Sequence, residues 1–148
     1  MLDALNAPAA PAVIQRDDYA QPDWLVPEIA LDFDLGAART RVRATLTVER
    51  NGDHDRPLRL DGDGLAPLSV RIDGEETAEW ALEQGVLVLP LPLARATIET
   101  EVVISPEANT QLMGLYASGG LLCTQCEAEG FRRITFFPDR PDVLSRYT

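Results

Sequence analysis

Apolar and polar residues alternate with a period of two through much of this 148-residue chain. The clearest runs are residues 29–35, "IALDFDL", and 41–50, "RVRATLTVER". The apolar members of the two runs are Ile29, Leu31, Phe33, Leu35, Val42, Ala44, Leu46 and Val48. Successive side chains of a strand point to opposite faces, so each run predicts a β-strand with one buried face. The connecting "GAART" has the length of a hairpin loop.

Shorter strands with turn residues between them follow. The segment 57–76 predicts two short strands around a Gly/Asp turn and ends at the turn Asp73-Gly74. The segment 78–92 predicts a hairpin across Gln84-Gly85, and residues 96–105 predict a long strand. Helical periodicity is missing from the first 105 residues, and only "SPEAN", with Ser105 as cap, predicts a single helical turn. The pattern predicts an all-β chain folded as an antiparallel sandwich or barrel-like sheet.

The length predicts one domain, and its start is predicted to be irregular. Residues 1–28 contain four prolines, each of which removes an N–H donor and restricts the residue before it. Trp24, Leu25 and Val26 are expected to pin this segment to the surface of a β-rich domain over 29–148. Residues 110–148 have a less regular apolar pattern, so we expect the functional loop there.

The charge of the chain narrows the possible partners. Acidic residues number 24 against 13 basic ones, giving a net charge of −11. Such a field repels nucleic acids and anionic membranes. Apolar runs fall short of the roughly 20 residues that cross a bilayer. The N-terminus lacks the basic and apolar regions of a signal peptide, so a cytoplasmic location is expected.

The two cysteines, Cys123 and Cys126, have C-x-x-C spacing, which is compatible with a redox dithiol, half of a zinc site or plain packing. A redox dithiol needs a helix start in a βαβ unit, which this chain lacks. A structural zinc site needs four ligands, and the single histidine, His54, lies in a predicted solvated turn. The spacing alone therefore favours packing. "DGDG" at 61–64 does not fulfil a calcium-loop pattern and is interpreted as a turn.

Carboxylates and an amide follow in the same segment. Glu127 and Glu129 are two residues apart, so on an extended segment they share a face. One could bind a cation while the other pairs with Arg132 or Arg133. Gln125 precedes Glu127 by two residues, which would let its amide oxygen and the carboxylate project together. This pair is a candidate clamp for an ammonium group.

The run "CTQCEAEGFRRIT", followed by "DRPDVLSRYT", closely resembles the N-terminal domain of bacterial aminopeptidase N, a family of gluzincin-type zinc aminopeptidases. "YAQPDWLVPEIALDFDL" and "TRVRATLTVER" fit the family's opening strands more loosely. The resemblance extends over about residues 17–148. It implies a saddle-like β-sheet domain that packs on a thermolysin-like catalytic domain of the same chain.

The resemblance also implies functions for single residues. Gln125 and Glu127 would bind the free α-amino group of a peptide, and both cysteines would be neither redox nor metal centres. The catalytic zinc and its H-E-x-x-H ligands would lie beyond Thr148. This chain would then be an inactive, C-terminally truncated part of a broad-specificity aminopeptidase. The truncated chain would be able to self-associate. The alternative is a stand-alone β-sandwich binding or scaffold module without enzyme activity.

Overall fold

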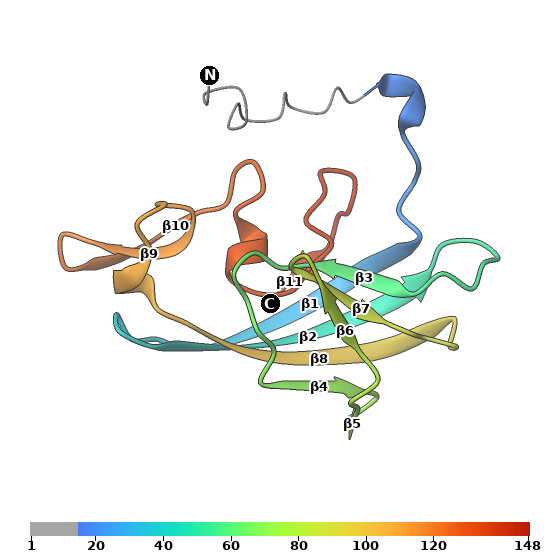
Figure 1. Cartoon of the computed structure of the whole chain (residues 1–148), viewed down its shortest axis with the longest axis horizontal. Helices are drawn as coiled ribbons and strands as arrows, with labels where there is room; N and C mark the ends of the chain where they lie inside the picture. The colour runs from blue at the N-terminus through green and yellow to red at the C-terminus, as the bar shows by residue number, and fades with distance from the viewer. Residues whose placement is uncertain (1–14) are drawn as a thin grey trace, which may run out of the picture.

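The computed structural model describes residues 15–148 and confirms the all-β fold (Figure 1). The helical residues in this range form three short 3-10 turns, and none of its helices is long and apolar enough to cross a membrane. The strands are β1 (Trp24–Asp34), β2 (Thr40–Arg50), β3 (Leu58–Asp61), β4 (Ser69–Ile72), β5 (Glu75–Glu76), β6 (Ala81–Glu83), β7 (Val86–Leu89), β8 (Arg95–Ile104), β9 (Gly114–Ser118), β10 (Leu121–Gln125) and β11 (Arg146–Tyr147). The 3-10 turns are η1 (Arg16–Asp18), η2 (Pro106–Ala108) and η3 (Phe131–Arg133).

The largest sheet has six strands in the order β11-β1-β2-β8-β4-β5. The strands β1, β2 and β8 are long and form its centre, with unbroken antiparallel pairing between β2 and β8 (Figure 1). The prediction of antiparallel pairing holds for every pair in this sheet except one, because β11 runs parallel to β1. The last strand is thereby brought back to the first.

A second sheet, β3-β7-β6, covers the large one and closes the core between them. The predicted hairpin across Gln84-Gly85 is confirmed as β6–β7, and both turn residues have positive φ, as the tight hairpin turn requires. The two strands predicted within 57–76 also form, but β3 pairs with β7 while β4 pairs with β8. Apolar side chains of both sheets share one cluster that includes Leu46, Leu60, Leu87 and Ile98.

The prediction of an irregular segment as far as residue 28 is wrong at its end. Residues 1–14 lie outside the described range, but β1 already begins at Trp24. Trp24 and Val26 are core residues rather than surface contacts, with 4% and 1% of their surfaces exposed. Pro27 is accommodated because the β1–β2 register shifts between Leu25 and Glu28, a local irregularity that tolerates a missing N–H.

The predicted inward face of β1 is correct only for its first half. Ile29 is buried and Leu31 half-buried, but Phe33 and Leu35 are 39% and 59% exposed. In the described chain, the outer side of β1 is paired with β11 and Thr148 only as far as Leu31. Beyond that point β1 is an edge strand, and the side chains of Phe33 and, just past its end, Leu35 are only partly covered. Along β2, by contrast, all four predicted inward residues are buried.

Candidate functional site

The sequence-predicted site lies at the end of the β9–β10 hairpin. This two-stranded sheet is separate from the other two and projects to one side of the molecule (Figure 1). β10 ends at Gln125, which pairs with Gly114 at the start of β9. η2 lies against β9, and its Pro106 occupies the first turn as predicted. Ser105, however, makes no side-chain capping bond.

After Gln125 the chain turns back sharply on itself. Gly130 donates its backbone N–H to the carbonyl of Cys126 at 2.7 Å, and the peptide bond between Glu127 and Ala128 is cis. A Cβ on Gly130 would lie 2.4 Å from the Gln125 carbonyl oxygen. Glycine is therefore needed here for the close approach of two backbone segments, since the φ of −86° suits any residue.

Gln125 and Glu127 are both exposed on this turn. The sequence analysis expected the two side chains to project together from one extended segment. That expectation is wrong, because β10 ends at Gln125 and Glu127 lies in the following turn. Instead, Gln125 Nε2 donates to the backbone carbonyl of Glu127 at 3.1 Å. Within residues 15–148 neither the Gln125 amide oxygen nor the Glu127 carboxylate has a hydrogen-bond or ion-pair partner. A neutral acceptor and a negative charge on the same turn are thus both without a partner in the described residues.

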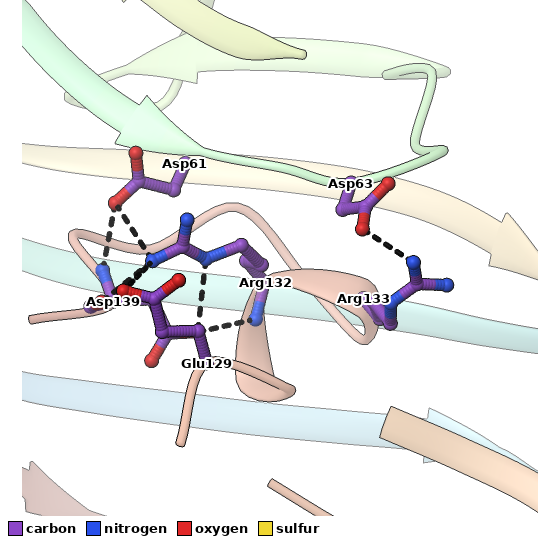
Figure 2. Close-up of polar contacts among 6 residues, drawn as sticks. All are labelled: Asp61, Asp63, Glu129, Arg132, Arg133 and Asp139. Atoms are coloured by element: carbon purple, nitrogen blue, oxygen red, sulfur yellow. Dashed lines mark hydrogen bonds and ion pairs between the residues drawn. The ribbon is translucent and has the colours of Figure 1, made fainter. Parts of the chain in front are cut away.

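Glu129 behaves differently from Glu127. Its carboxylate lies 3.5 Å from Arg132 Nη2, so the expected pairing of one glutamate with a neighbouring arginine is confirmed for Glu129 (Figure 2). Arg132 Nε and backbone N–H both donate to Asp139 Oδ2, at 3.2 and 3.1 Å. Its Nη2 donates to the Asp139 carbonyl at 2.8 Å. Asp61 Oδ2 lies 4.0 Å from the same nitrogen and accepts from the Asp139 N–H.

Arg133 belongs to a separate pair. Figure 2 shows its guanidinium directed away from Glu129, onto the carboxylate of Asp63. The backbone N–H of Asp63 bonds to the carbonyl of Arg132 at 2.9 Å. Gly114 packs closely beneath, with its missing Cβ position 2.7 Å from the Arg133 Cβ. The predicted turn at 61–64 is therefore a docking point for η3, and its aspartates are engaged by arginines and backbone.

The two cysteines are free thiols, as the packing interpretation requires. Cys126 packs against the main core cluster. Burial, and to a smaller extent the nearby Asp139 charge, raises the pKa of the Cys126 thiol above its ordinary value. A reactive dithiol needs the opposite shift, because the thiolate is the nucleophile. Cys126 therefore lacks the environment of a redox centre.

Potential zinc ligands are scattered within residues 15–148. No group of three or more potential metal ligands occurs among residues 15–148. His54, predicted as a solvated turn residue, is half-buried and packs edge-on against Trp24 with ring centroids 5.9 Å apart. Its Nε2 contacts the Asp23 carbonyl at 2.8 Å, and its Nδ1 accepts the Arg56 N–H at 3.2 Å. Both ring nitrogens are thus committed to backbone groups, and neither is free to bind a metal.

Sequence reasoning did not identify Asp61 and Asp139 as the residues that hold Arg132 in place. The two residues are 78 positions apart, and Asp61 was assigned only to a turn. No local pattern links them, since their meeting depends on β3 being joined to the segment after η3. Reciprocal backbone bonds between Asp61 and Phe137, at 2.9 and 3.1 Å, make that junction.

Comparison with known proteins agrees with the resemblance seen in the sequence. The chain is 49% identical over 138 residues to aminopeptidase N of Escherichia coli, a match over 93% of this chain and 16% of that protein. It superposes on aminopeptidase A of Legionella pneumophila, solved with aspartic acid, with a TM-score of 0.81 and 31% identity over 88% of this chain and 16% of that one. The M1 zinc metallopeptidase of Deinococcus radiodurans has the same fold, with a TM-score of 0.70 at 20% identity over 86% of this chain and 32% of that one.

No protein-family model matches the chain. The chain spans about a sixth of the length of the curated aminopeptidases that it resembles. By sequence and by fold it corresponds to the N-terminal region of bacterial aminopeptidase N.

Proposed function

We propose that this chain is the amine-binding, N-terminal domain of a cytoplasmic zinc aminopeptidase that removes N-terminal amino acids from peptides. The observation that carries the proposal is the 49% identity to aminopeptidase N over 93% of the chain. The partners are a peptide N-terminus and a catalytic domain of the same polypeptide. The net charge of −11 argues against nucleic acids and anionic membranes as partners.

The proposal places zinc outside this chain, because residues 15–148 contain no group of three or more potential metal ligands. Zinc bound in a catalytic domain would polarise the scissile carbonyl and activate a water molecule. The residues described here act on the other end of the substrate. They bind and orient its N-terminal amine.

Glu127 supplies a fixed negative charge for the ammonium, and Gln125 supplies a neutral acceptor. The bond from Gln125 Nε2 to the Glu127 carbonyl orients the amide so that its oxygen is the free end. An ammonium has three N–H donors and can bind both groups at once. The first peptide bond lies at a short covalent distance from the amine, so fixing the amine also places that bond relative to the protein, which is positioning of the kind that accelerates a reaction.

The negative charge of Glu127 also accounts for cleavage at the N-terminus of a peptide rather than within it. An internal segment of a peptide has no ammonium to place against Glu127. Its binding would leave a desolvated carboxylate unpaired, which is costly. The site therefore selects for a free N-terminus.

The test is substitution in the complete protein, assayed with an alanine anilide. We expect Glu127→Ala to lower kcat/KM by about 10- to 150-fold, the equivalent of about 1.5–3 kcal/mol for a hydrogen bond to a charged group. Gln125→Ala should cost less, because it removes a neutral acceptor. Glu76→Gln, an exposed carboxylate on β5, is the control. A kcat/KM within twofold for Glu127→Ala would show that the assigned binding function is wrong.

Two further observations separate this proposal from a stand-alone binding module. The coding sequence that follows Thr148 should contain H-E-x-x-H. The 148-residue chain alone, supplied with zinc, should not hydrolyse the anilide. Zinc-dependent turnover by the chain alone would contradict the proposal.

A further inference from the structure

The site loop, residues 125–130, carries two exposed glutamates, Glu127 and Glu129, that are chemically alike. Either carboxylate could attract an ammonium through its charge. Only Glu129 is paired, with Arg132 Nη2 at 3.5 Å, whereas Glu127 has no ionic partner within residues 15–148. The difference between the two glutamates therefore lies in the position of one arginine.

Arg132 is held in place more firmly than a typical surface arginine. Asp139 accepts three hydrogen bonds from it, and the Asp139 and Asp61 carboxylates flank the guanidinium at 3.2 and 4.0 Å. Its side chain is 24% exposed, and that of Asp139 is 14% exposed. A cation already fixed by such bonds loses little further freedom when it pairs with Glu129. Figure 2 shows the guanidinium enclosed by the three acidic residues.

We propose that Arg132 is a positioning residue that selects Glu127 as the amine ligand by neutralising Glu129. This inference rests on the proposed function, because it presupposes that Glu127 binds the ammonium. With Arg132 present, the loop offers a single uncompensated carboxylate. Without it, Glu129 becomes a second ammonium site, displaced from the first along the loop.

Binding of the amine at Glu129 would hold the peptide out of register and would be unproductive. Unproductive binding lowers kcat and KM by a common factor and leaves kcat/KM unchanged. For two equally strong sites the factor is about twofold, and it grows as Glu129 becomes the preferred site. A loop that has only lost its order behaves differently, because kcat/KM itself then falls.

The experiment compares Arg132→Gln, Glu129→Gln and the double variant in the complete protein, again with the alanine anilide. Arg132→Gln is expected to lower kcat and KM together, by at least about twofold. Adding Glu129→Gln should restore both constants, because the competing carboxylate is then neutral. Arg133→Gln is the matched control, since it removes an equal charge from the neighbouring residue but breaks only the pair with Asp63. Its kcat and KM should stay near those of the unsubstituted protein. A rise in KM for Arg132→Gln, or no recovery in the double variant, would overturn the inference.

A second comparison leaves Arg132 in place and does not depend on its variant folding. Glu129 is 63% exposed, so Glu129→Gln should fold and keep kcat and KM within twofold. Glu127→Gln should lose at least tenfold in kcat/KM. Equal losses for the two glutamates would overturn the selection of Glu127 by Arg132. If Glu127→Gln itself has no effect, the proposed amine site fails, which is a separate and recognisable outcome.

Discussion

Replacing Gly130 with alanine tests whether close backbone contact shapes the site loop. The added Cβ would lie 2.4 Å from the Gln125 carbonyl oxygen and 2.9 Å from the Cys126 Cα. The first distance is about 1 Å short of an ordinary van der Waals contact, so the end of β10 must move. The φ of −86° is allowed for alanine, which leaves the clash as the only source of strain.

We expect Gly130→Ala to lower the free energy of unfolding by about 1–3 kcal/mol, the usual cost of overpacking. If the proposed function holds, kcat/KM of the complete protein should fall as well, by up to about 100-fold for a 1 Å displacement of Gln125. Urea unfolding of the 148-residue chain gives the first quantity and steady-state kinetics the second.

Gly52→Ala is the informative control for this experiment. Gly52 has a φ of +99° with no atom within 4 Å of its missing Cβ, so alanine there is strained without any clash. We expect it to cost about 1–2 kcal/mol of stability and to leave kcat/KM unchanged. If Gly130→Ala were as stable and as active as the unsubstituted protein, the packing argument would be refuted.

Three further predictions concern pH, the thiols and association. Hydrogen bonding from Arg140, and to a smaller extent from Tyr19, holds the pKa of Asp142 below its ordinary value. The ionised Asp142 therefore stabilises the folded state, and this stabilisation is lost when the carboxylate is protonated at low pH. Urea midpoints should therefore fall below about pH 4, and less steeply in Asp142→Asn. The raised pKa of Cys126 predicts that, in a Cys123→Ser variant, iodoacetamide alkylates it more slowly than free cysteine at pH 8; faster reaction would contradict this. The chain should associate as salt screens its charge of −11, which sedimentation velocity would detect; a monomer at every salt concentration would oppose this expectation.

Strands β2 and β8 were predictable because one face of each is buried along nearly all of its length. The alternation placed β2 and β8 to within a residue of their bounds. It failed along β1, where Pro27 falls within a register shift and Phe33 lies on an open edge. Periodicity records which side chains are apolar, but not whether another part of the folded chain packs over them.

The candidate site divides in the same way between local and long-range features. The sequence predicted that one of the two glutamates pairs with Arg132 or Arg133, and the structure selects Glu129 and Arg132, three residues apart. The anchoring of Arg132 by Asp139 and Asp61 did not follow from the sequence, since it depends on segments that meet only in the folded chain. The function of Gln125 and Glu127 stays a prediction until the substitutions are made.

The parallel pairing of β1 with β11 has a consequence for the order of folding. Glu28 pairs with Arg146, 118 residues later, and Thr148 exchanges backbone bonds with Ile29 and Leu31. At 5–20 residues per second a ribosome needs roughly 6–24 s to synthesise that stretch, during which the outer edge of β1 has no partner from its own chain. Contacts this distant in sequence form slowly. The nascent first strand is therefore the part of this domain most exposed to mispairing, and a chaperone that holds extended apolar segments would act there first.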